Sequence, residues 1–456
     1  MKGKDLIFKV FRHEPTERAP WVPFVGVHAG KILGKDATEM LTNGDSLFKG
    51  VIEAAKLYHA DGIPIMFDLQ VEAEILGCEL LWAPKGPPSV KTHPLEDVDE
   101  VPCVCKVPFP TDGRLPMILD VMKRVKDEIG ETTALYGLIC GPFTLASHLR
   151  GNNIFMDMFE NEGYVNELLA YCVAVNKAMA KMYIDAGMDV IAVVDPLVSQ
   201  ISPEHFEIFL SQPFTDLFAY IRENKTFGSF FVCGNASHSI EVMCQTQPDG
   251  IAVDENVNMV KAKEITDRYG IAIGGNIPLT TVMLHGTQQD NMKCVVELID
   301  SLGIGNYIVS PGCDMPYDIP LENTIAAAQA VRETAKVKEM IKNYEAPRED
   351  IVVELPDYAR LSKPLIEVCT LDSETCAACT YIMGAANEVK KHFGKAIDVV
   401  EYKYMFKKDI ARFVKMGVAQ LPSIYINGKL AYSSLIPNKA EFIAKVSAAM
   451  EEINNR

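Results

Sequence analysis

Short apolar runs of strand character recur between Pro20 and Gly312, and each is followed by a longer segment with helical spacing and charged faces. Their apolarity is continuous rather than alternating, which indicates strands buried on both faces, as in a parallel sheet covered by crossover helices. Eight such units predict an α/β fold, a (β/α)8 barrel over residues 1–342. The runs are WVPFVG (21–26), GIPIMFD (62–68), ALYGLICG (134–141), DVIAVVD (189–195), SFFVCGN (229–235), GIAVDE (250–255), IAIGGN (271–276) and NYIVSPG (306–312).

Polar or reactive side chains stand at the ends of several of these runs. Because the carboxyl ends of barrel strands surround the active site, we expect these side chains to converge on one pocket. Asp68 and Asp195 are candidate catalytic residues that would orient a substrate, although an aspartate at a strand end can equally cap a helix. Asn235 and Asn276 are candidate substrate-binding residues.

Charge and hydropathy exclude two classes of partner. The chain has 61 acidic and 44 basic residues and a net charge of −17, so it has no summed positive field for nucleic acid. No apolar run reaches the roughly 18 residues of a membrane span, and the N-terminus mixes charges into its apolar stretch, unlike a secretory signal. We therefore expect a cytoplasmic protein, whose 12 cysteines serve as thiols, metal ligands or redox catalysts rather than structural disulfides.

The composition changes after the predicted barrel. Residues 343–363 mix prolines and charges without periodicity, which is typical of a linker. Residues 364–456 then read as strand, helix, strand, helix, hairpin and helix, with the hairpin turning at Asn427-Gly428. This order, with a Cys-Ala-Ala-Cys sequence at a helix start and Leu421-Pro422 before the hairpin, resembles the thioredoxin and glutaredoxin family.

The thioredoxin resemblance implies roles for three residues. Cys376, at a helix N-terminus, would be the attacking thiolate, and Cys379 would resolve the mixed disulfide. Pro422 would stand at the cis-proline position beside the substrate. Two alternatives remain, a docking module without redox chemistry and a CxxC zinc site, the second disfavoured because no further cysteine pair lies nearby.

Five segments of the predicted barrel carry a family pattern: GPFTLASHLRG (141–151), DPLVSQISPEHFEIFLSQPF (195–214), VDENVNM (253–259), GGNIPLTTVMLHGT (274–287) and SPGCDMPYDIPLENT (310–324). They resemble the uroporphyrinogen decarboxylase superfamily. The first strand lacks the arginine-rich Met-Arg-Gln-Ala-Gly-Arg motif of true decarboxylases, and VPFVGVHAGK stands there instead. Without those arginines a polycarboxylate tetrapyrrole loses its electrostatic clamp. VEAEILGCE (71–79), Cys233-Gly-Asn and Pro311-Gly-Cys313 are closer to the corrinoid-dependent branch, of the methylcobalamin:coenzyme M methyltransferase type.

That branch implies a zinc ion, held by a His-x-Cys after one strand and a Cys after the last, which keeps the acceptor thiol as a thiolate. Cys233 and Cys313 match the two cysteines, but Phe231 occupies the histidine position. A catalytic zinc ordinarily needs three protein ligands and one open position. His238 or Glu72 is the expected third ligand, and Glu74, His148 and Asp254 are further candidates. The alternative is a pair of buried cysteines without metal.

The resemblances together imply a methyltransferase. It would move a methyl group between a corrinoid, carried on a separate protein, and a thiol or other small nucleophile activated at Cys233 and Cys313. Two alternatives stay open: a decarboxylase variant, and a redox-responsive module that binds a tetrapyrrole or thiol without turnover. A methylcobalamin demethylation assay and metal analysis would separate them.

Overall fold

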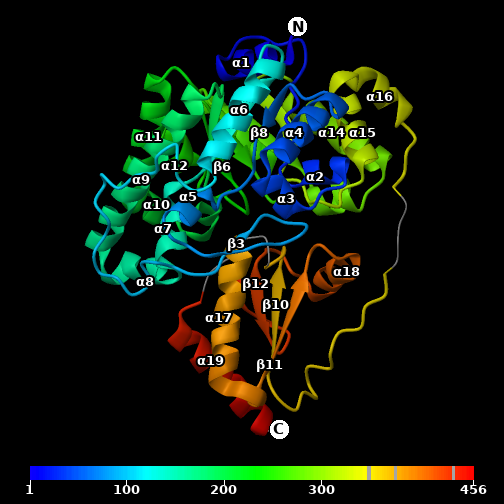
Figure 1. The fold of residues 1–456 in the computed structure, drawn as a ribbon. Coiled ribbons are helices and arrows are strands. Elements are labelled where there is room, and N and C mark those ends of the chain that lie inside the picture. Colours follow the sequence, from blue (N-terminus) through cyan, green and yellow to red (C-terminus); the bar gives the residue numbers. More distant parts are fainter. Residues whose placement is uncertain (347–350, 374–376, 434–436, 456) are drawn as a thin grey trace. The chain divides into compact units, whose positions relative to one another are not determined.

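The computed structural model describes residues 1–346, 351–373, 377–433 and 437–455 (Figure 1). The chain divides into two compact units, Met1–Ala346 and Pro347–Arg456. The expected linker 343–363 does not lie wholly between them. Tyr358 Oη donates to Glu367 Oε2 at 2.8 Å, and Lys415 Nζ donates to the Val353 carbonyl at 2.6 Å, so this part of the linker bonds to the second unit.

A seven-stranded parallel sheet forms the centre of the first unit (Figure 1). All neighbouring strands pair in parallel, and the strand order follows the sequence. The sheet therefore grows by one strand with each strand–helix unit, as the sequence pattern predicts. The strands are β1 (Gly62–Pro64), β4 (Ala134–Cys140), β5 (Val190–Val194), β6 (Phe227–Val232), β7 (Gly250–Val253), β8 (Ala272–Ile277) and β9 (Tyr307–Pro311).

The first of the eight expected strands, at 21–26, is wrong as a strand. Only Trp21 pairs there, in a single parallel bridge to Val309 of β9. The Trp21 carbonyl also accepts from the Asp61 and Gly62 amides at 2.9 and 3.3 Å, so this residue connects the two edge strands. Prolines at positions 20 and 23 lack the N–H groups that a longer ladder would need.

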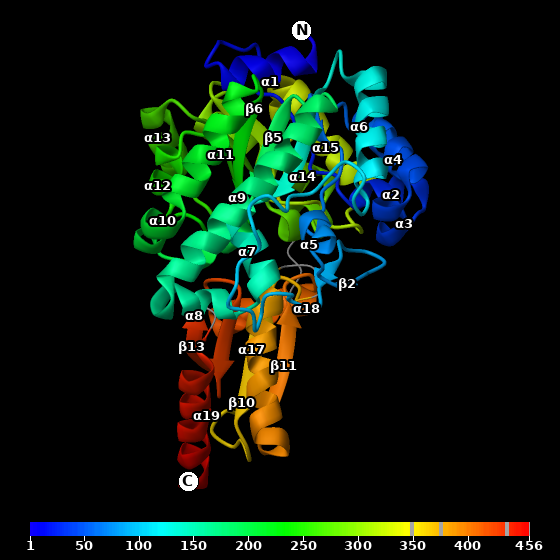
Figure 2. The same cartoon turned by 60° about the vertical axis from the view of Figure 1, so that its left-hand side comes forward.

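Helices surround this sheet, as Figure 2 shows for α9 and α11 outside β5 and β6. Polar caps begin several of them: Ser202 Oγ accepts from the His205 amide at 3.3 Å, and Thr287 forms a capping box with Asp290. Among the described residues, no helix is long and apolar enough to cross a bilayer. The helices are α1 (Gly3–Phe11), α2 (His28–Leu33), α3 (Ala37–Thr42), α4 (Gly44–Leu57), α5 (Val71–Ile75), α6 (Leu115–Ile129), α7 (Pro142–Arg150), α8 (Asn153–Glu160), α9 (Glu162–Asp185), α10 (Pro203–Phe209), α11 (Ser211–Glu223), α12 (Ile240–Gln245), α13 (Met259–Tyr269), α14 (Gln288–Leu302), α15 (Leu321–Arg332) and α16 (Thr334–Met340); a short hairpin, β2 (Leu80–Leu81) with β3 (Ser89–Val90), follows α5.

The second unit is a four-stranded sheet in the order β11-β10-β12-β13. β10 pairs in parallel with β11 and antiparallel with β12, and β12 and β13 form the hairpin. The Leu421–Pro422 peptide bond before this hairpin is cis. The succession of strands and helices agrees with the expected one: β10 (Leu365–Thr370), α17 (Ala377–Phe393), β11 (Asp398–Lys403), α18 (Lys407–Met416), β12 (Ser423–Ile426), β13 (Lys429–Ser433) and α19 (Lys439–Asn454).

Two separate apolar clusters hold this second sheet. Ile366 and Val368 of β10 pack in one cluster with residues of α17 and α19, including Ile382 and Phe442. Cys369 packs in the other, with Tyr425 of β12 and Phe413 of α18. Since neighbouring residues of a strand point to opposite faces, α17 and α19 cover one face and α18 the other.

Candidate functional site

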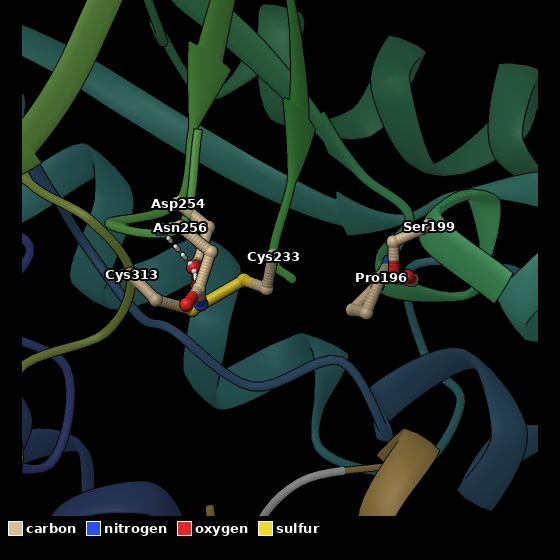
Figure 3. Close-up of a disulfide and its surroundings, with 6 residues drawn as sticks. All are labelled: Pro196, Ser199, Cys233, Asp254, Asn256 and Cys313. Atoms are coloured by element: carbon tan, nitrogen blue, oxygen red, sulfur yellow. Dashed lines mark hydrogen bonds between the residues drawn. A yellow bond between two sulfur atoms is a disulfide. The ribbon is translucent and has the colours of Figure 1, made fainter. Parts of the chain in front are cut away.

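Cys233 and Cys313 form a disulfide at the carboxyl edge of the first sheet, meaning the carboxyl ends of its seven strands with the loops that follow them (Figure 3). Cys233 follows β6 directly and Cys313 lies two residues beyond β9, 80 positions later in the chain. Their Cα atoms are 6.0 Å apart, and both side chains are partly exposed. The expectation that the two cysteines meet at strand ends is confirmed, whereas a disulfide was not expected.

The loop after β7 lies beside the disulfide, and Asp254 and Asn256 come from it (Figure 3). Asp254 Oδ1 accepts from the Asn256 amide at 2.9 Å, and the same carboxylate accepts from the Gly234 amide next to Cys233. Burial raises the pKa of Asp254. Asn276 Nδ2 donates to the Asp254 and Val257 carbonyls at 2.9 and 2.8 Å. Asn276 was expected to bind substrate, but its side-chain amide donates both hydrogen bonds to this loop.

Two glycines let the cysteine loops come close to their neighbours. A Cβ on Gly312 would lie 2.7 Å from the Glu255 backbone nitrogen, and a Cβ on Gly234 would lie 2.7 Å from Ser199 Oγ. Gly234 also has φ +87°, in the region that favours glycine. Larger residues at these positions would push the loops apart, so the glycines help to keep the two sulfur atoms opposed.

An aromatic cluster fills the place where the resemblance implies a histidine. Phe231 is 1% exposed and lies two residues before Cys233 on β6, so both side chains point to the same face of the strand. Its ring centroid is 4.9 Å from that of Phe24 and 5.9 Å from that of Phe67. Cys233 and Cys313 pack against the same apolar core. The surroundings of Phe231 are hydrocarbon, with no metal-binding atom in these ring contacts.

The residues proposed as a third zinc ligand are engaged elsewhere. His238 Nε2 donates to the Ile201 carbonyl at 2.9 Å. Glu72 Oε1 accepts from the Cys140 amide at 3.0 Å, and burial raises the pKa of Glu72 to about 8, which leaves a neutral carboxyl group at neutral pH. His148 Nδ1 lies 4.0 Å from Cys140 Sγ, and Glu74 Oε2 pairs with Arg114 Nε at 2.6 Å.

No group of three His, Cys, Asp or Glu side chains suited to a metal ion occurs within the described part of the chain. The described residues therefore do not assemble the expected zinc site with His238 or Glu72 as third ligand, because the two cysteines bond to each other and Phe231 stands in the histidine position. Two sulfur ligands do not make a stable catalytic zinc site. The residues present therefore do not fit a zinc ion.

Asp195 caps a helix. Its carboxylate accepts from the Phe143 and Thr144 amides at 2.9 and 3.0 Å and from Thr144 Oγ1 at 2.6 Å, at the first turn of α7. Burial raises the pKa of Asp195 to about 7 despite these bonds. The helix is the one after β4, not the one that follows Asp195 itself, and the geometry favours the capping interpretation over a catalytic one.

Asp68 and Asn235 remain near strand ends. Asp68 Oδ2 lies 2.7 Å from Arg114 Nη1, and its Oδ1 accepts from the Gln70 amide at 2.9 Å. Asn235 Oδ1 accepts from the Ser237 amide at 3.2 Å, and its side chain is partly exposed. Asp68 is thus fixed by a buried ion pair, whereas Asn235 uses its side-chain oxygen within its own loop.

Sequence reasoning did not identify Arg114 or Asp314. Arg114 lies just before α6 in a loop without a recognisable motif, and only the folded chain brings it to Asp68. Asp314 is partly exposed as a residue, and its carboxylate accepts from the Met315 and Val27 amides, while desolvation raises its pKa. A Cβ on Gly26 would lie 2.1 Å from Asp314 Oδ1. The position of Asp314 directly after Cys313 was the sequence signal that could have identified it.

Two of the three residues expected to form a redox site, Cys379 and Pro422, lie in the described part of the second unit. Cys379 lies in α17, and its Sγ accepts from the Leu371 amide at 3.3 Å. Pro422 follows the cis peptide bond at the start of the hairpin. Cys376, the expected attacking thiolate, lies outside the described residues.

The first unit has the architecture of α/β proteins with a curled parallel sheet, whose functional residues gather at the carboxyl ends of the strands. The sequence model of the uroporphyrinogen decarboxylase (URO-D) family matches residues 2–334, and the chain belongs to this family. The matched residues all fall within the first unit.

Individual relatives show which members of this family the chain is similar to. The chain is 27% identical over 348 residues to the methylcobamide:CoM methyltransferase MtbA of Methanosarcina acetivorans, covering 75% of this chain and 98% of the relative. It is 28% identical over 343 residues to the methylcobamide:CoM methyltransferase MtaA of Methanosarcina barkeri, covering 72% and 96%. A solved methyltransferase from Methanosarcina mazei shares the fold, with a TM-score of 0.67 at 23% identity over 74% of this chain and 99% of that one.

Proposed function

We propose that this protein is a corrinoid-dependent methyltransferase that moves a methyl group between a corrinoid, carried by a separate protein, and a thiol. The proposal is supported by the similarity to named relatives, taken together with the position of the two cysteines. Relatives named methylcobamide:CoM methyltransferases match the chain over nearly their whole length, and Cys233 and Cys313 meet at the carboxyl edge, where such a fold places its chemistry.

The cysteines act in this proposal as thiols, after their disulfide is reduced. A cysteine thiolate is a general base of suitable strength for the proton of an acceptor thiol. Asp254 and Asn276 would fix the loop beside that thiol, and Asn235 and Asp68 are the remaining candidates for substrate contact. Thus Asn276 and Asp195 have positional roles in this scheme, and the reacting atoms are sulfur.

A demethylation assay tests the proposal. Protein treated with a dithiol reductant and then freed of it is mixed with methylcobalamin and coenzyme M, the thiol in the relatives' names. We expect methylcobalamin absorbance to fall in proportion to enzyme and methylated thiol to appear in equal amount. Decarboxylation of uroporphyrinogen at an enzyme-like rate, with no loss of methyl from methylcobalamin, would support the decarboxylase alternative instead.

We also propose that the second unit is a thioredoxin-like module in which Cys376 attacks and Cys379 resolves. The strand order, the place of Pro422 directly before β12 and the position of Cys379 in the first turn of α17 support this proposal. A Cys379→Ser variant should trap Cys376 in a mixed disulfide under mild oxidation, because the resolving thiol is missing. Mass spectrometry would identify the partner as a cysteine of the first unit or a small thiol. Absence of any mixed disulfide would leave a docking module.

A further inference from the structure

The two cysteines of the carboxyl edge occupy a place where sequence reasoning expected a metal, yet they are bonded to each other. We propose that Cys233 and Cys313 form a reversible dithiol–disulfide couple, so that the carboxyl edge is itself a site of thiol–disulfide exchange. The co-reactant is a dithiol, either a small molecule or a protein Cys-x-x-Cys pair. The proposal stands whether or not the protein transfers methyl groups.

Access and selectivity support this assignment. Both cysteines are partly exposed, so an attacking thiolate can approach a sulfur atom of the bond. The other described cysteines of the same unit are free: Cys78, Cys140, Cys172 and Cys244 are buried, Cys294 is half-buried, and Cys103 and Cys105 are exposed. The pairing therefore selects two cysteines 80 positions apart, both at the ends of strands, where a solution reductant can reach them.

The surrounding backbone favours reclosure after reduction. The Asp254 carboxylate bonds to the Gly234 amide on the Cys233 side, and Gly312 lies against the Glu255 amide on the Cys313 side. The loop after β7 thus contacts both cysteine loops, and neither contact involves a sulfur atom. Because these contacts do not depend on the S–S bond, the two thiols stay opposed and react as an intramolecular pair of high effective concentration.

Among the residues that the structure describes, no third metal ligand joins the two cysteines, so metal binding does not compete with exchange. A metal bound by both cysteines would consume them as ligands and block exchange. Phe231 on the same face of β6 packs against Phe24 and Phe67, and His238 donates to the Ile201 carbonyl. With only two sulfur ligands in place, the reduced pair remains a dithiol that an oxidant or a disulfide can convert.

The exchange balances without further reagents. A thiolate of the co-reactant attacks one sulfur of the Cys233–Cys313 bond, a mixed disulfide forms, and the other cysteine leaves as a thiolate. The second thiol of the co-reactant then attacks the mixed disulfide and releases the first cysteine. The co-reactant becomes a disulfide, and the protein pair gains two electrons and two protons.

A consequence for methyl transfer rests on the proposed function. The disulfide occupies both sulfur atoms, so the oxidised protein has no thiolate to act as base. We expect oxidised protein to demethylate methylcobalamin at least about tenfold more slowly than reduced protein, since loss of a general base costs on the order of 100-fold or more when complete. Activity should return on addition of dithiothreitol.

Mass spectrometry of trapped thiols tests the couple directly on the full chain. Protein purified without reductant is alkylated with N-ethylmaleimide, digested and mapped, before and after treatment with dithiothreitol. We expect the Cys233 and Cys313 peptides to be linked before treatment and both alkylated after it, and linked again when the reductant is removed in air. A protein in which both cysteines are alkylated from the start, with one divalent metal bound per chain, would overturn the proposal.

Two glycine variants test the part played by the backbone. Gly312→Ala would force the Cys313 loop away from Glu255, and we expect reclosure of the disulfide to slow by at least about tenfold, in line with the loss of a well-oriented geometry. Gly305→Ala is the matched control, because a Cβ there meets no atom within 4 Å. Equal reclosure rates in both variants would show that the contact does not position the pair. A normal couple with no demethylation in any redox state would reject the methyltransferase proposal alone.

Discussion

The two cysteine pairs of this protein differ in how the chain brings them together. Cys376 and Cys379 stand three positions apart, and the second lies in the first turn of α17. Cys233 and Cys313 stand 80 positions apart and come from β6 and β9, with β7 and β8 between those strands in the sheet. The first pair can be recognised from a local sequence motif. The second pair exists only because the sheet curves and brings distant strand ends together.

The contacts around the two cysteine pairs also differ in how far along the sequence they reach. The contacts that hold the Cys233–Cys313 pair come from separate elements: the loop after β7, Ser199 after β5, and the aromatic cluster of Phe24, Phe67 and Phe231. Cys379 Sγ is held by the Leu371 amide, eight positions away. The long-range pair thus depends on the whole first sheet, and changes far away in sequence should alter it.

The largest expected effect contrasts the two pairs in methyl transfer. With dithiothreitol present, Cys233→Ser should lower the rate of methylcobalamin demethylation at least about 100-fold, the scale of removing a general base. Cys376→Ser should leave that rate within about threefold, because added reductant replaces the module. Equal losses in the two variants would mean that both pairs serve the methyl-transfer step. Exposed Cys103→Ser is the control for loss of an unrelated thiol.

The second prediction restores the missing ligand. Phe231→His places an imidazole on the same face of β6 as Cys233, and the reduced variant should hold about one zinc ion per chain, while reduced wild type holds less than about a tenth of that. Elemental analysis after gel filtration measures the difference. Phe231→Leu controls for disruption of the aromatic cluster and should bind no zinc. Stoichiometric zinc in reduced wild type would show that a third ligand exists after all.

The third prediction concerns the pH dependence of the first unit, which contains both tryptophans, Trp21 and Trp82. Burial raises the pKa of Glu72 to about 8 from the ordinary value of 4.5, so between these values the folded state binds more protons than the unfolded state. The free energy of unfolding should therefore fall as pH rises through this range, by up to about 1.4 kcal/mol per pH unit.

Glu72→Gln removes that proton and should flatten the slope. Asp195, whose pKa is raised to about 7 by burial, still contributes below pH 7, so the slope decreases without vanishing. Urea unfolding followed by tryptophan fluorescence reports on the first unit alone. Glu53→Gln on the exposed face of α4 is the matched control, and the same flattening in both variants would contradict the assignment to Glu72.

The smallest effect is expected from separating the two units. Limited proteolysis between Ala346 and Val353 should yield fragments of about 38 and 12 kDa, as for two units that each have their own core. Demethylation by the nicked protein with added reductant should stay within about twofold of the intact chain. Cleavage that abolishes activity would show that the methyl-transfer step needs the second unit.

The local sequence predicted the helices and strands well, but it did not predict which distant residues their side chains contact. Continuous apolar runs gave β4 to β9 within a few residues, but the prolines around Trp21 reduced the first expected strand to one bridge. Asp195 was expected at a strand end and lies there, yet the helix that it caps begins after a different strand. Asn276 likewise lies at its expected strand end, and its bonds to the loop after β7 decide its role.

The sequence by itself determined the parallel sheet, the second unit's order of elements and the positions of Cys233 and Cys313 at strand ends, because periodicity, caps and turns act over a few neighbouring residues. Only the tertiary structure decided that the two sulfur atoms bond, that Phe231 packs on Phe24 and Phe67, and that His238 and Glu72 are engaged elsewhere. Those outcomes depend on which residues from distant strands meet, and that is set by the closure of the sheet rather than by any local pattern.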